Sequence, residues 1–126
     1  MKLSAFLSIK AVMCFVFGIP MLLAPMGVMS LFGVALDPPG ALMTRFFGVV
    51  LIAVGLICWF LREAAESVTR RDVLLALFVG DTLGFIVALA GQRAGLMNPL
   101  GWVVVAIWLL LALGLGYFRF LRPAAA

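Results

Sequence analysis

The chain has 126 residues, of which 67% are hydrophobic and only 11% are charged. A soluble domain of this length cannot bury so much apolar surface, so lipid must be the solvent for most of it. The net charge of +4 comes from basic residues scattered near the ends of apolar runs. Membrane topology explains such a distribution, and nucleic acid is therefore not among the expected partners. The length predicts a single transmembrane domain over residues 1–126.

The first apolar run extends from Leu3 to Leu36. One straight helix of that length would measure about 50 Å, against a hydrocarbon core of about 30 Å. Pro20 and Pro25 indicate where the chain turns. We therefore expect a first span over about residues 4–23 and a short interfacial helix over about residues 24–33, opened by Pro25. The alternative is a span over residues 11–33, because membrane helices tolerate proline and glycine.

A second span is predicted over about residues 40–61. Asp37 is suited to cap this helix, and Pro38 is suited to its first turn. A strongly polar break follows the span, from Arg62 to Arg71.

The third span is predicted over about residues 71–90. Thr69 followed by Asp72 resembles a capping box at its start, and Gly91 is expected to end it. A fourth span is predicted over about residues 99–120, with Asn98 as its cap and Pro123 beyond its end. These spans predict an all-α fold, an antiparallel four-helix transmembrane bundle with a short interfacial helix after the first span.

The basic residues predict the orientation in the membrane. With four spans, the termini and the second loop share one face, and the cytoplasmic face is the one richer in Lys and Arg. Trp59 and Tyr117 then mark the cytoplasmic interface, and Trp102 marks the outer one. Both termini are expected in the cytoplasm because the basic residues divide seven to two, with Lys2, Lys10, Arg62, Arg70, Arg71, Arg119 and Arg122 on one face and Arg45 and Arg93 on the other.

Asp81 lies in the middle of the third apolar run. A charge at membrane depth is costly, so such a residue usually faces a bundle interior and has a partner. Asp81 shares a helix face with small residues, and in the second helix Arg45 shares a face with Gly48 and Gly55. Because small residues mark close helix contacts in membranes, the two charges are predicted to point inward, towards each other.

Other polar side chains accompany this predicted intramembrane polar site. Trp108 lies at the midpoint of the fourth span and has an indole N–H that needs a partner if it is buried. Thr82 and Thr44 add hydroxyl groups. Lys10 is expected to snorkel to the cytoplasmic headgroups instead. The Arg–Asp pair has two interpretations: it fixes the packing of the helices, or it lines a cavity for a small solute, a lipid headgroup or a proton.

The chain also resembles a group of small membrane proteins. An ordered string of short motifs carries the resemblance: Ala24-Pro25, Leu31-Phe32-Gly33, Arg45-Phe46-Phe47-Gly48 and Gly55-Leu56, with Gly80-Asp81 and Asn98-x-x-Gly101-Trp102 further along. It is similar to the pattern of the DoxX-like and related uncharacterised bacterial four-span families. This resemblance implies a bacterial inner-membrane four-helix bundle and carries over no activity or catalytic residues.

Composition also excludes several classes of function. The chain has no histidine, which removes the commonest metal ligand and general base, and Cys14 and Cys58 form no CxxC motif. We therefore expect no enzyme, no cofactor and no metal site. The leading hypothesis is a non-enzymatic accessory or interaction subunit whose partners are the lipid bilayer and either further copies of itself or a larger membrane complex. The alternative is a small-solute or proton-coupled carrier that uses Asp81 and Arg45, and a membrane enzyme acting on a lipid or quinone is a weaker third.

Overall fold

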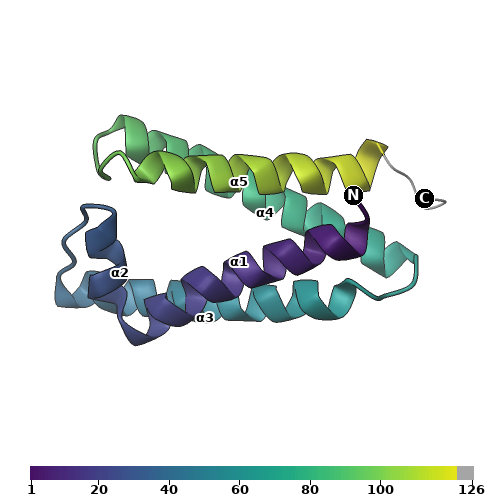
Figure 1. The fold of residues 1–126 in the computed structure, drawn as a ribbon, viewed down its shortest axis with the longest axis horizontal. Helices are drawn as coiled ribbons and strands as arrows, with labels where there is room; N and C mark the ends of the chain where they lie inside the picture. Colours follow the sequence, from purple (N-terminus) through teal and green to yellow (C-terminus); the bar gives the residue numbers. More distant parts are fainter. Residues whose placement is uncertain (122–126) are drawn as a thin grey trace. The chain divides into compact units, whose positions relative to one another are not determined.

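The computed structural model describes residues 1–121, and this part of the chain is helical and contains no strand. The prediction of an all-α fold is confirmed. Arg122, which contributes to the predicted orientation, and Pro123, expected beyond the last helix, lie outside the described residues. The elements in chain order are α1 (Leu3–Leu23), α2 (Pro25–Leu31), α3 (Pro38–Leu61), α4 (Val68–Arg93), α5 (Gly101–Gly116) and a terminal π-helical turn, η1 (Tyr117–Leu121) (Figure 1).

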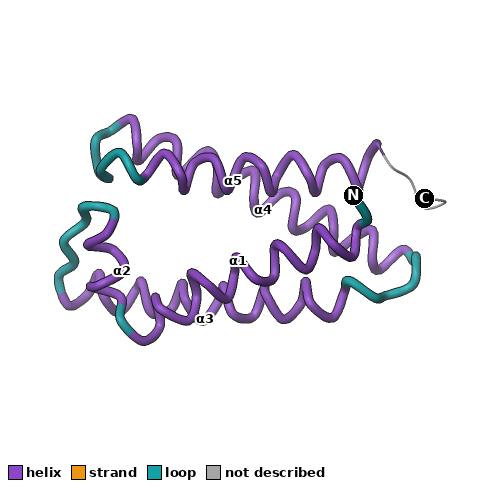
Figure 2. Tube along the Cα trace, in the orientation of Figure 1, coloured by secondary structure: helices purple, strands orange, loops and turns teal. Residues whose placement is uncertain are grey.

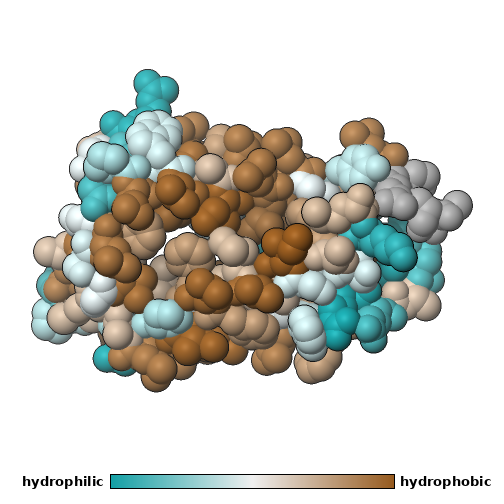
Figure 3. Space-filling model, in the orientation of Figure 1, coloured by the Kyte–Doolittle hydropathy of each residue, from teal (hydrophilic) through white to brown (hydrophobic). Residues whose placement is uncertain are grey.

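Four helical segments are long and apolar enough to cross a membrane: Leu3–Leu23, Pro38–Leu61, Val68–Arg93 and Gly101–Leu121. Their lengths of 21, 24, 26 and 21 residues are close to the roughly 20 residues that a hydrocarbon core of about 30 Å requires. On the face in Figure 3, hydrophobic residues cover the middle stretches of α1 and α5, and hydrophilic ones gather towards the helix ends. The chain therefore has the build of a multi-pass membrane protein.

The chain divides into two compact units, Met1–Glu63 and Ala64–Ala126. In the first unit α1 packs antiparallel against α3, and α2 lies in the connection between them (Figure 2). In the second unit α4 packs antiparallel against α5 and is also contacted by η1. The prediction that all four helices form a single bundle stays a prediction.

The first two helices are separated at Ala24, whose backbone leaves the helical region at φ −144° and ψ 64°. Pro25 occupies the first position of α2 and has no N–H to donate to the preceding turn. Helix α1 therefore covers the first of the two predicted spans, and the alternative helix over residues 11–33 is wrong.

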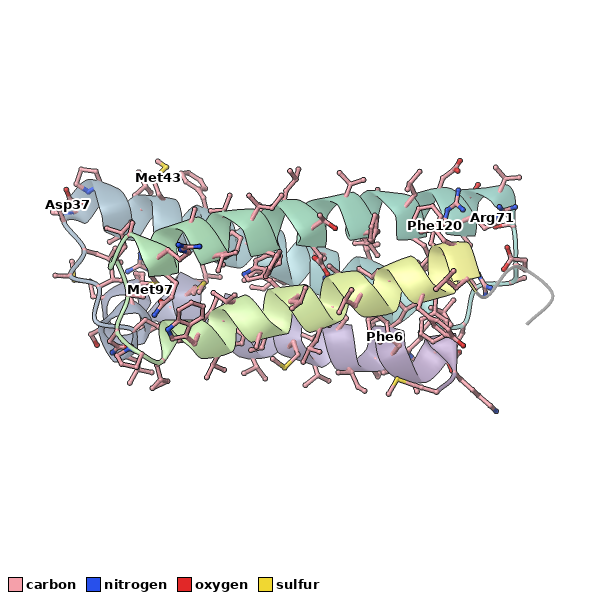
Figure 4. The ribbon with its side chains drawn as sticks, turned by 90° about the horizontal axis from the view of Figure 1, so that it is seen from above. Phe6, Asp37, Met43, Arg71, Met97 and Phe120 are labelled. Atoms are coloured by element: carbon pink, nitrogen blue, oxygen red, sulfur yellow. The ribbon has the colours of Figure 1, made fainter. Side chains whose placement is uncertain are left out.

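The start of α3 is as predicted. The Asp37 side chain accepts a hydrogen bond of 2.7 Å from the Gly40 backbone nitrogen, and Pro38 lies in the first turn. Figure 4 labels Asp37 at this end of the helix, with Met43 one to two turns further along.

The boundaries of α4 differ from the prediction at both ends. The helix begins at Val68, and its cap is Ser67, whose hydroxyl accepts a 3.0 Å hydrogen bond from the Arg70 nitrogen. Thr69 and Asp72 lie inside the helix, so the predicted capping box is wrong. The residue that caps the helix is Ser67, two residues before Thr69.

The helix also continues past Gly91 to Arg93. Its end is a Schellman motif, in which Gly95 at φ +77° donates to the Gln92 carbonyl and Leu96 donates to the Gly91 carbonyl. The glycine that ends the helix is therefore Gly95, because the motif requires a left-handed residue after the last turn and Gly91 is not one.

Helix α5 begins at Gly101, two residues later than predicted. Asn98 still acts as a local cap, because its side-chain oxygen accepts a 3.0 Å hydrogen bond from the Leu100 nitrogen. The difference arises because the Gly101, Trp102 and Val103 nitrogens donate three residues back, so the first turn is tighter than an α-helix.

Candidate functional site

Glycines bring α1 and α3 into backbone contact in the first unit. A Cβ placed on Gly48 would lie 2.7 Å from the Gly18 carbonyl oxygen, and a Cβ on Gly18 would lie 3.0 Å from the Gly48 carbonyl oxygen. About two turns further along α3, a Cβ on Gly55 would lie 2.9 Å from the Phe15 ring and 3.1 Å from the Cys14 Cβ. The predicted small-residue face of the second span therefore does make a close helix contact, and its partner is α1.

Arg45 lies on α3 beside this contact and is exposed. Its Nη1 donates a 2.6 Å hydrogen bond to the carbonyl oxygen of Leu22, in the last turn of α1. Carbonyls in the last turn of a helix lack intrahelical donors, and a basic side chain is one way to satisfy them. Arg45 therefore caps the end of α1 from the neighbouring helix, a role that sequence reasoning missed because Leu22 contributes only its backbone.

Thr44 is also engaged locally. Its hydroxyl donates a 2.9 Å hydrogen bond to the Gly40 carbonyl, one turn earlier in α3. This bond uses the only donor of the hydroxyl, so Thr44 has only acceptor capacity left for any other group.

In the second unit two glycines receive aromatic rings. A Cβ on Gly84 of α4 would overlap the six-membered ring of Trp108 from α5, and a Cβ on Gly116 of α5 would lie 2.9 Å from the Phe78 ring of α4. Each helix thus has a notch filled by an aromatic residue of the other. Arg119 donates a 3.1 Å hydrogen bond to the Arg71 carbonyl. This bond lies at the end of the helix pair where Figure 4 labels Arg71 and Phe120.

Asp81 is buried, with 5% of its surface exposed, close to the middle of α4. It lies one turn before Gly84, so the Trp108 ring packs on the same helix face as the carboxylate. Thr82 follows directly and is half-buried. The second unit thus contains Asp81, Thr82 and Trp108, three of the residues predicted for the polar site, and the Trp108 ring packs one turn from Asp81, whereas Arg45 and Thr44 belong to the first unit.

Lys10 is the buried cation of the first unit, with only 2% of its surface exposed. The prediction that it snorkels to the headgroups is wrong, because it lies on the buried face of α1. The signal that identifies this face in the sequence is the helical spacing of Lys10 with Leu7, Ala11 and Cys14, which are all buried.

Gln92 is a second polar residue that sequence reasoning missed. It is 9% exposed, its Nε2 donates a 3.1 Å hydrogen bond to the Asn98 carbonyl, and its Oε1 is buried without a hydrogen-bond partner in the described structure. That oxygen fills the space in which a Cβ of Gly101 would lie. Gln92 therefore joins the end of α4 to the start of α5.

The described residues contain no cluster of three or more His, Cys, Asp or Glu side chains placed to hold a metal ion. The candidate site is thus a buried carboxylate with a hydroxyl and an indole ring nearby. Such a group can neutralise a buried cation or exchange a proton. Comparisons with family models, with curated proteins and with solved structures found no match for this chain. The resemblance to the DoxX-like families accordingly stays a prediction.

Proposed function

We propose that this chain is a non-enzymatic accessory or interaction subunit that packs in the bilayer against further copies of itself or against a larger membrane complex. The observation that carries the proposal is the hydrogen bond from Arg45 Nη1 to the Leu22 carbonyl. One of the two charges expected to line a transport site is engaged in holding two helices together, as expected of a packing protein.

The remaining contacts of the two helix pairs support the same proposal. Glycines receive backbone or aromatic groups, and Thr44 bonds to its own helix. Small residues of this kind make helix association in lipid specific, because the hydrophobic effect does not distinguish a helix from a lipid tail. The large apolar side chains directed away from these contacts, among them Phe46, Phe60 and Leu110, are left for lipid or for another transmembrane helix.

The membrane we propose is the bacterial inner membrane, with both termini in the cytoplasm. The seven-to-two division of Lys and Arg supports this orientation. An impermeant thiol reagent tests it. Ala94→Cys should react from outside the cell, and Ala65→Cys should react only after the membrane is opened, because both positions are exposed but lie in successive loops. Labelling of Ala94→Cys only from the cytoplasmic side would contradict the orientation.

A small-solute or proton-coupled carrier is the second candidate. The observation that favours it is the burial of Asp81 in the middle of a helix long enough to span the membrane. In this proposal Asp81 becomes accessible from one side during transport, and Arg45 supplies the opposite charge.

Two measurements on the same purified protein separate the candidates. Proteoliposomes with a pH-sensitive dye report proton-linked flux, and mild-detergent purification reports self-association or a stable larger complex. For an accessory subunit we expect a stable assembly and equal dye signals from the parent and from Asp81→Asn. Flux that is lost in Asp81→Asn, while the variant keeps its helical content and elution volume, would refute the accessory role and establish the carrier.

A further inference from the structure

An open apolar groove lies between α1 and α3 at the end of the first unit where α3 terminates. It is lined by Val12 and Phe15 from α1 and by Leu56 and Trp59 from α3, with no polar lining. Val12, Leu56 and Trp59 are exposed, and both helices are long and apolar enough to cross a membrane, so lipid can occupy the groove. On α1 the exposed residues Val16 and Ile19 continue its line towards the C-terminal end of the helix.

A cation stacks on Trp59, one of the residues that line this groove. The guanidinium of Arg62, the residue after the last turn of α3, stacks 3.8 Å from the centre of the Trp59 ring. Its Nη1 donates a 2.7 Å hydrogen bond to the exposed carboxylate of Glu63, and its Nε has no partner among the described residues. A pair with an exposed neighbouring carboxylate contributes little stability, so an anion of better geometry can replace it.

We propose that this groove and Arg62 together bind one anionic phospholipid. The acyl chain lies against Val12, Phe15 and Leu56, and the phosphate accepts hydrogen bonds from the Arg62 guanidinium. An apolar slot with a cation stacked on its tryptophan matches the order of tail, interface and phosphate in a phospholipid. Planar guanidinium groups suit phosphate because they present paired donors.

The selectivity for an anionic lipid should depend on Arg62 itself. The carbonyl end of α3 carries partial negative charge, which opposes an anion at this position. The N-terminus of α1 does not compensate for this, because Val12 and Phe15 come from the middle of that helix. Removing the guanidinium should therefore abolish the preference, and removing the competing Glu63 carboxylate should strengthen it.

Native mass spectrometry of the full chain tests the site. The probes are phosphatidylglycerol and phosphatidylcholine with identical acyl chains, supplied in equal amounts. We expect the parent to retain phosphatidylglycerol on the order of tenfold more often, the effect of one charge-assisted contact. The preference should disappear in Arg62→Gln, increase in Glu63→Gln and persist in Lys2→Gln, a matched control that removes one positive charge from the same unit at a residue that does not line the groove.

One further variant tests the apolar part of the groove. Val12→Trp fills the groove and should reduce retention of both lipids without changing their ratio. Glu63→Gln keeps the proposal testable if Arg62→Gln fails to fold. The proposal is overturned by a parent without preference, by an unchanged preference in Arg62→Gln, by no increase in Glu63→Gln, or by an equal loss in Lys2→Gln, which would indicate attraction by overall charge.

Discussion

The two helix pairs use glycine in different ways. In the first unit Gly18 and Gly48 face each other, so the backbones of α1 and α3 meet. In the second unit Gly84 and Gly116 each face an aromatic ring of the other helix. A backbone cannot move away from an added methyl group without separating the helices, whereas a ring can change its rotamer. Glycine therefore makes a rigid contact at Gly18 and Gly48 and an adjustable one at Gly84 and Gly116.

The largest expected effect is on the backbone contact. Gly48→Ala should lower the free energy of unfolding by about 3 kcal/mol, because the added Cβ meets the Gly18 carbonyl and the Leu22 nitrogen at 2.7 and 2.8 Å. Unfolding in mixed detergent micelles, followed by circular dichroism, measures it. Gly80→Ala is the matched control, since its Cβ would meet nothing within 4 Å. Equal stabilities of the two variants would remove the distinction between the pairs.

A smaller effect is expected at the aromatic contact. Gly84→Ala should cost about 2 kcal/mol, because the Trp108 ring must shift to admit the methyl group. In a Trp108→Leu background the same substitution should cost almost nothing, since the ring that it meets is absent. A double-mutant cycle gives this coupling. A penalty that is unchanged in the Trp108→Leu background would show that the backbone, and not the ring, limits this site.

The smallest expected effect concerns the charged residues Arg45 of the first helix pair and Asp81 of the second. The predicted coupling of Asp81 with Arg45 is tested by a cycle of Asp81→Asn and Arg45→Gln. We expect a coupling of about 1 kcal/mol, because Asp81 is buried whereas Arg45 is exposed and already donates to the Leu22 carbonyl. Additivity would mean that the two pairs carry their charges independently.

Much of the fold follows from the sequence alone. The number of spans, the break before Pro25 and the Asp37 cap are predictable because they depend on local chemistry: apolar length, a missing proline N–H and a side chain that reaches the next turn. Ser67 and Gly95 show the limit of such rules. Thr69 is as suitable a helix cap as Ser67, and Gly91 is as suitable a helix end as Gly95. Only the path of the backbone selects one residue of each pair.

The partners of the candidate site residues were decided by tertiary structure. The sequence identifies Asp81 as a charge at membrane depth and places Arg45 on a glycine face. It does not contain the information that this face meets α1, that a Leu22 carbonyl accepts from Arg45, or that Gly84 receives the Trp108 ring. Helical periodicity determines which residues share a face, but a glycine face fits a backbone or a ring equally well. Which of them it meets depends on the register of two helices, and that register is set only when they pack.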